Sequence, residues 1–363
     1  MDANRRFEIR QRCPSLRELE KSVPLKINSL VLTEGCVTVN DTAYRIGSIR
    51  KSKTGETPIH VAELNNIGGV SYDVDEYGVQ DESEELPVTP GDLVLSQHER
   101  PFMQQEGLLI QSLEFSIQFC EEDLANLRER RPSRRNLEKI HKIEKVIEEF
   151  RAMKQMVTLL FGGRSSPVHV TKLGIDFLIP GVIRLSIGLK LHIEQLVFRA
   201  GSGTTVEVLA PILQESSFPL KKLEIGGWSD EDVTNPMVQT AESLRIRGYL
   251  TNIPQALSSI TNPVVCISMQ MLPEQAIEKL VGNWIESQRP VGYKYIFDFY
   301  CEPSIPAEME DMLKELNGVI IDDETVIIPM SECTQLKVSY GPFQEFAPRS
   351  KWAVKFLTEA IVN

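Results

Sequence analysis

The chain has 363 residues, of which 42% are hydrophobic, and a formal net charge of −12 at pH 7. This apolar content is enough to bury a core in one or more domains, and it excludes the intrinsically disordered class. The acidic balance gives a surface that on average repels phosphate backbones and anionic lipids, so we expect no nucleic acid and no membrane as partner.

The cysteine pattern and the first residues indicate an intracellular protein. The six cysteines are far apart in sequence, with no C-x-x-C motif, which predicts free thiols rather than zinc ligands or a disulfide framework. The N-terminal stretch lacks the apolar segment of a signal peptide, and no later run approaches the length of a membrane span. We therefore expect a cytoplasmic or nuclear location.

Residues 1–24 carry an apolar stripe that Pro14 interrupts. The stripe consists of Phe7, Ile9, Cys13, Leu16 and Leu19. Because proline inside a helix removes a hydrogen bond and clashes with the preceding turn, the pattern predicts two short helical turns rather than one helix. Two interpretations remain open, since such a segment can pack on the chain's own body or on a partner protein.

Residues 25–115 are typical of a small β-rich module. Short β-prone runs such as LVLTEGCVTVN, TAYRIGSI and DLVLSQ alternate with turn signals such as TGETP and NNIGG. Within this module, DVDEYGVQDESE at 73–84 matches five positions of a calcium-binding EF-hand loop. Position 5 is Tyr77, however, and the preceding residues are not helical in pattern, so we interpret 73–84 as a solvated acidic turn and predict no metal.

Residues 116–163 predict a long amphipathic helix with a basic beginning. Apolar residues recur at intervals of three and four from Leu137 to Leu160, and Gly162 and Gly163 are expected to end the helix. Residues 128–145 hold eight basic and three acidic side chains, a local reversal of the overall charge. Candidate contacts to an acidic partner are Arg130, Arg131, Arg134 and Arg135; the alternative is a solvated helix face.

Residues 164–363 repeat the pattern φ-x-x-L-x-φ, where φ is apolar. The central positions 173, 196, 223, 244 and 267 are 23, 27, 21 and 23 residues apart, within the range of leucine-rich repeats. We expect each copy of the pattern to form a strand, and a looser copy lies at 333–338. Between copies, we expect helices at 204–216 and 273–287. His169 and His192 occupy equivalent positions in two copies, which favours a structural role over a metal site.

Beyond the last regular copy, we expect a strand at 294–300 and helices at 306–318 and 349–362. Stacked units of this kind bury a shared core and present a broad binding face. The exposed position after each central residue then predicts partner contacts at Gly174, Val197, Glu224, Arg245 and Ser268. No phosphate-binding loop, dinucleotide motif, metalloprotease motif or nucleophile elbow occurs, so we expect a non-catalytic protein without a cofactor.

The N-terminal third resembles a known family. The segments RRFEIRQRCPSLRELEKSVPLKINSL, VNDTAYRIG, NNIGGVSYDVDEYGVQD and ELPVTPGDLVL are similar, in order, to the nematode F-box C family, with a weaker resemblance through the remainder. The resemblance implies an F-box-like segment followed by a family-specific domain. F-box proteins bind a Skp-type adaptor and present substrates to a cullin-based ubiquitin ligase. Only the latter part of the F-box has a counterpart, with adaptor contacts implied at Phe7, Ile9, Pro14, Leu16 and Leu19.

Together these observations predict an α/β chain, with a small β-rich N-terminal module followed by an irregular leucine-rich-repeat-like array of strands and helices. The expected segments are 1–24, 25–115, 116–163 and 164–363. The predicted function is protein recognition as the substrate receptor of a ubiquitin ligase. The alternative is a scaffolding protein that holds an acidic partner through its basic helix.

Overall fold

The structure is a computed structural model that describes a defined set of residues. These are 1–33, 35–46, 59–66, 92–95, 152–177, 181–200, 206–226, 235–247, 260–269, 274–299, 316, 318–322, 324–342 and 352–361. The chain divides into two compact units, of which unit 1 contains residues 1–193 and 208–214 and unit 2 contains 194–207 and 215–363. Each unit is described by itself.

The fold is mixed α/β, with many strands and few helices among the described residues. The strands are β1 (Lys26–Thr33), β2 (Cys36–Val39), β3 (Thr42–Arg45), β4 (Leu93–Leu95), β5 (Val168–Phe177), β6 (Gly181–Ile183), β7 (Leu191–Ala200), β8 (Lys222–Gly226), β9 (Ser243–Arg247), β10 (Val264–Met269), β11 (Lys294–Phe299), β12 (Val319–Asp322), β13 (Thr325–Pro329), β14 (Thr334–Pro342) and β15 (Trp352–Ala360). Thirteen of them form one hydrogen-bonded sheet, and β4 pairs with β6.

The helices of the described residues are short. They are α1 (Ala3–Arg12), η1 (Pro14–Leu16), α2 (Arg17–Ser22), α3 (Ile59–Asn66), η2 (Val206–Leu209), η3 (Glu215–Ser217), α6 (Pro236–Gln239) and α8 (Glu274–Glu286), of which the η elements are 3₁₀ turns. A further helix occupies residues 152–161. The break at Pro14 confirms the two helical pieces predicted for the N-terminal segment.

In unit 1, the first three strands and the first repeat strand, β5, belong to one hydrogen-bonded sheet. β2 pairs antiparallel with both β1 and β3, and β1 pairs parallel with β5, where Leu30 lies opposite Leu173. Both leucines are fully buried. The sequence placed these strands in two segments, 25–115 and 164–363, whereas in the structure β1 and β5 are hydrogen-bonded neighbours in one sheet.

A buried carboxylate joins the smaller strand pair of unit 1 to the helix at 152–161. The side chain of Asp92, just before β4, lies 2.7 Å from Lys154 Nζ and 3.0 Å from Arg184 Nη1. The backbone N–H of Leu185, after β6, also donates to Asp92. Desolvation lowers the pKa of both Lys154 and Arg184, and the opposing charge of Asp92 partly offsets this shift.

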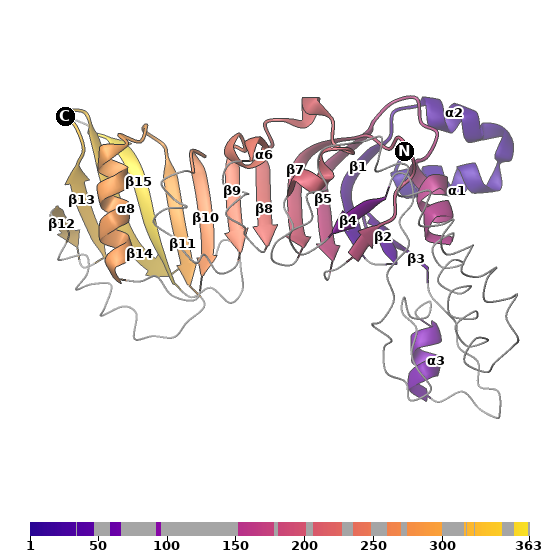
Figure 1. Ribbon diagram of the computed structural model, residues 1–363, viewed down its shortest axis with the longest axis horizontal. Coiled ribbons are helices and arrows are strands. Elements are labelled where there is room, and N and C mark those ends of the chain that lie inside the picture. Colours follow the sequence, from indigo (N-terminus) through magenta and orange to yellow (C-terminus); the bar gives the residue numbers. More distant parts are fainter. Residues whose placement is uncertain are drawn as a thin grey trace, which may run out of the picture. The chain divides into compact units, whose positions relative to one another are not determined.

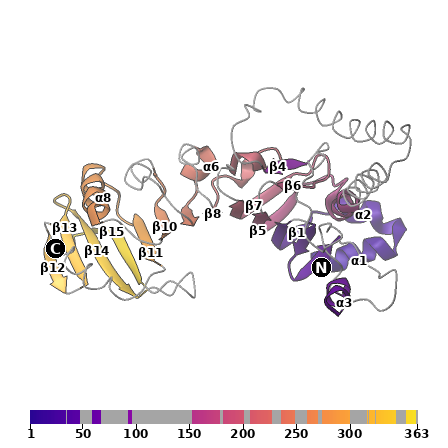
Figure 2. The same cartoon turned by 60° about the horizontal axis from the view of Figure 1, so that its bottom comes forward.

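In unit 2, parallel strands lie side by side in chain order from β7 to β11 (Figure 1). Leu196, Leu223, Leu244 and Val265 lie opposite one another in adjacent strands. β11 then pairs antiparallel with β15, and β14, β13 and β12 continue antiparallel. Helix α8 lies against this part of the sheet (Figures 1 and 2). Its Trp284 indole contacts the ring of Phe356 in β15.

The predicted repeat strands are all observed, including β14 at the looser last copy and β11 at 294–300. The alignment of the fifth copy was shifted by two residues, because Val265 rather than Ile267 pairs with Leu244. The helix predicted at 273–287 is confirmed as α8. The helix predicted at 204–216 is wrong: the described residues form only η2 and η3, and Pro211 lies where a longer helix would need a backbone donor.

The helix predicted at 349–362 is also wrong, because residues 352–360 form strand β15. Val354, Phe356 and Thr358 are buried at alternate positions, whereas Lys355, Leu357 and Glu359 are partly exposed, which is the period of a strand. Most of the helix predicted at 306–318 lies outside the described residues.

Asn262 connects the loop before β10 to the preceding repeat unit. The residue is 1% exposed, and its Nδ2 donates to the carbonyl oxygens of Val238 and Ala241, each at 2.7 Å. We expect Asn262→Ala to lower the free energy of unfolding by about 1–3 kcal/mol, because it leaves buried carbonyls without a donor. Urea denaturation measures this loss. Thr261→Ala, which removes an exposed contact of 3.5 Å, is the control and should change little.

Candidate functional site

The N-terminal helices are anchored to the body of unit 1 by an aromatic contact. Phe7 of α1 packs edge to face against Tyr44 of β3 and Phe161, with ring centroids 6.2 and 6.1 Å apart. Ala3 is buried beside it, and Asp2 caps the helix by accepting from the backbone N–H groups of Asn4 and Arg5. One side of α1 is therefore fixed against the chain's own sheet.

A group of buried charges holds α2 to the same body. The carboxylate of Glu20 lies 2.9 Å from Arg6 Nη2, 2.9 Å from Arg164 Nη2 and 3.8 Å from Arg10 Nη1. We call these four residues the arginine cluster. Their side chains are all at least about nine-tenths buried, and desolvation lowers the pKa of Arg10 and of Arg164 against the raising effect of Glu20. The cluster ties α1 and α2 to the loop after residue 161.

This anchoring leaves apolar side chains of α2 and its flanks uncovered. Leu16 is 40%, Leu19 64% and Val23 46% exposed, and Pro14 is exposed as well. We call Pro14, Leu16, Leu19 and Val23 the α2 surface. Of the five predicted adaptor contacts, Phe7 faces inward, Ile9 is half-buried, and Pro14, Leu16 and Leu19 lie on this surface. The segment thus packs on its own body through α1 and is open to solvent through α2.

The strand face predicted to bind partners is not exposed. Gly174 is buried, with Val31 against the position of its missing Cβ, and Val197, Glu224, Arg245 and Ser268 are each no more than 8% exposed. The prediction assumed that alternate residues of each strand face solvent. In β8 and β9, however, three consecutive residues are buried, as expected for parallel strands covered on both faces.

The charged members of that face, Glu224 and Arg245, are each paired with opposite charges in unit 2. Glu224 Oε1 lies 3.2 Å from Arg199 Nη2 and 2.9 Å from Arg247 Nε. Arg245 Nη2 lies 3.2 Å from Asp298 Oδ2 and donates to Ser268 Oγ. Burial, followed by the charge of Asp298, raises the pKa of the nearby Cys266 thiol to about 12, so that thiol is not a thiolate nucleophile at neutral pH.

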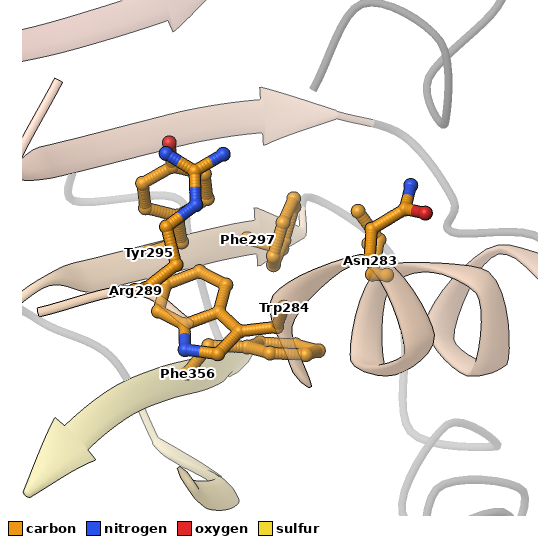
Figure 3. Close-up of a pocket in the computed structure, with 7 residues that line it drawn as sticks. Asn283, Trp284, Arg289, Tyr295, Phe297 and Phe356 are labelled. Atoms are coloured by element: carbon orange, nitrogen blue, oxygen red, sulfur yellow. The ribbon is translucent and has the colours of Figure 1, made fainter. Parts of the chain in front are cut away.

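A cavity beneath α8 is filled by its own aromatic lining. Figure 3 shows Trp284, Tyr295, Phe297 and Phe356 gathered there, with Arg289 over the rings of Trp284 and Tyr295. The remaining volume is about 10 Å³, room for a single water molecule at most. Trp284 Nε1 donates to Thr358 Oγ1, and Tyr295 OH donates to the Ile260 carbonyl, so this is packing rather than a ligand pocket.

The other sequence candidates are placed as follows. His169 and His192 are neighbours, with ring centroids 5.0 Å apart, and burial followed by the charge of His192 lowers the pKa of His169. Within the described ranges, no group of three or more potential metal ligands occurs. The acidic stretch 73–84 and the basic residues Arg130, Arg131, Arg134 and Arg135 lie outside the described residues.

The sequence interpretation missed Glu20 and Arg164. They are 144 residues apart, and each is one of many charged residues in its neighbourhood. The only sequence signal is that the buried position of α2 holds the charged residue Glu20 instead of an apolar one. Three-dimensional proximity alone identifies them as a pair.

We expect Glu20→Gln to lower the free energy of unfolding by about 3–5 kcal/mol, because it leaves three buried guanidinium groups without their carboxylate. Urea denaturation of the whole chain measures the change. Glu18→Gln, on the same helix with a side chain 86% exposed, is the matched control and should cost less than about 1 kcal/mol. Equal stability of the two variants would show that the arginine cluster does not anchor α2.

A comparison with protein families matches part of the chain. A family model described as "Domain of unknown function (DUF3557)" matches residues 150–300, which include the helix at 152–161 and strands β5 to β11. No curated protein and no solved structure matches the chain. Among the described residues, no helix is long and apolar enough to cross a membrane. Residues 150–300 of the chain are therefore similar to a domain whose family description assigns no activity.

Proposed function

We propose that this protein is a non-catalytic recognition subunit that binds a Skp-type adaptor through the α2 surface and acts as a substrate receptor of a cullin-based ubiquitin ligase. The observation that carries the proposal is the exposure of Leu16, Leu19 and Val23 on a segment that is otherwise firmly anchored. The same segment carries the resemblance to the F-box C family. We place its action in the cytoplasm or nucleus.

Anchoring and exposure together support binding by α2. Exposed apolar side chains on a rigid support bind at low entropic cost, because the surface is already ordered before the partner arrives. Phe7 and Glu20 supply that support from the opposite side of the segment. The proposal assigns adaptor contact to Pro14, Leu16 and Leu19, and assigns Phe7 to the fold instead.

The repeat strands supply the scaffold for substrate recognition in this proposal. We regard them as an irregular array of the leucine-rich-repeat-like kind, in which strands recur and helices are largely reduced to turns. Gly174, Val197, Glu224, Arg245 and Ser268 are buried, so substrate contacts are assigned to surfaces other than these five positions. The substrate itself is a protein of unspecified identity.

The test is adaptor binding by the 363-residue chain and by the double variant Leu16→Lys, Leu19→Lys. We expect the wild-type chain to bind a purified Skp-type adaptor and the double variant to bind at least about tenfold more weakly, because two apolar contacts become charged. Biolayer interferometry measures both dissociation constants. Circular dichroism melting establishes that both proteins are folded.

Val23→Lys and Val291→Lys are a matched pair of controls. Val23 belongs to the α2 surface and is 46% exposed, whereas Val291 lies in unit 2 and is 54% exposed. Only Val23→Lys should weaken adaptor binding. A folded wild-type chain that fails to bind the adaptor would contradict the ligase role, and the scaffolding function through Arg130, Arg131, Arg134 and Arg135 would then be the one to test.

A further inference from the structure

A polar groove of about 350 Å³ opens in unit 1 where two loops meet. One loop follows the helix at 152–161 and the other precedes β7. The described residues that line it include Arg164, Ser166, Ser186, Lys190 and Gln214, and none of the described lining residues is acidic. Its volume is in the range of sites for small organic ligands. It is therefore far larger than the filled cavity beneath α8.

Several donors beside this groove lack an acceptor. Ser186 is 4% exposed, and its Oγ makes no hydrogen bond to any described residue. The Arg164 side chain is 3% exposed; its Nη2 donates to Glu20, but Nε and Nη1 have no hydrogen-bond partner in the part of the chain that the structure describes. Ser166 Oγ is likewise buried without one. A buried donor without an acceptor lowers the stability of the fold. Several such donors on residues that line one groove therefore favour a ligand there that accepts hydrogen bonds.

The charge around the groove is also unbalanced. In the arginine cluster, three guanidinium groups share the single carboxylate of Glu20, and Nη1 of Arg10 makes no hydrogen bond with the described residues. Lys190 adds an ammonium group at the groove, where it donates to the Pro211 carbonyl. Lys21 lies close to Gly163 of the groove lining, since a Cβ on that glycine would be 3.1 Å from Lys21 Nζ, but its charge is already paired with Glu18 at 3.2 Å. An anion in the groove would offset this excess of positive charge.

We propose that the groove binds the phosphate group of a small phosphorylated molecule. Arg164 and Lys190 supply positive charge, and the hydroxyls of Ser166 and Ser186 supply neutral donors. A phosphate monoester has three terminal oxygens and carries close to two negative charges, so it satisfies more of these donors than a carboxylate with two oxygens. The site is separate in chemistry from the apolar α2 surface and does not depend on adaptor binding.

The test is calorimetric titration of the full chain with glycerol 1-phosphate at fixed ionic strength, with sodium chloride as the reference titration. We expect saturable binding to the wild-type chain that Ser186→Ala and Lys190→Gln each weaken about five- to tenfold, since each removes one donor. Lys221→Gln is the matched control, because Lys221 is an exposed lysine of unit 2 paired with Glu194. It should leave the affinity unchanged.

Arg164→Lys adds a test of the guanidinium itself. The lysine keeps a positive charge for Glu20 but removes the two nitrogens that lack an acceptor, so phosphate affinity should fall while the chain stays folded by circular dichroism. Should this variant unfold, Ser186→Ala alone tests the site, because the Ser186 hydroxyl has no hydrogen bond to a described residue that the substitution could remove.

Sedimentation with vesicles containing phosphatidic acid distinguishes the two sources of the phosphate group. Binding of glycerol 1-phosphate alone identifies a soluble ligand, and vesicle binding that Ser186→Ala abolishes identifies a lipid headgroup; both outcomes support the site. Absence of binding in both experiments, or equal binding by wild-type, Ser186→Ala and Lys190→Gln proteins, would overturn it.

Discussion

Parallel strands are covered on both faces, and this constraint decides which side chains of the parallel strands in unit 2 are buried. Leu223, Glu224 and Ile225 are consecutive in β8 and all buried, so apolar and charged residues of one strand share an interior. A buried charge needs an opposite charge beside it. Glu224 and Asp298 therefore lie against arginines, and a strand face that could have bound partners is instead internal structure.

The same rule holds in unit 1. Asp92 lies against two cations inside the fold, Lys154 and Arg184. Glu20 lies against three arginines, and one of them, Arg164, lines a groove large enough for a small ligand. The consequence is one charge cluster with two roles: it fixes α2 so that Leu16 and Leu19 face solvent, and it supplies a positive wall for an anion.

Local patterns explain which predictions succeeded and which failed. Recurrent apolar residues located β5, β7, β8, β9 and β10, and Pro14 marked the break between α1 and α2. The last strand was predicted as a helix because Trp352, Phe356 and Ala360 also fit a spacing of four. Val354 and Thr358 are β-branched and alternate with Phe356 in the buried positions, a signal that favours a strand.

The sequence by itself determined the strand-forming segments, the helix α8 and the apolar stripe of the N-terminal segment, because these follow from residue spacing within a short window. Only the tertiary structure decided which side chains are exposed. Leu19 is exposed whereas Phe7 is buried, and Arg245 is buried despite its charge. The pairing of Glu20 with Arg164 was also beyond the sequence, because it joins residues that are distant along the chain and become neighbours only when the sheet and helices pack.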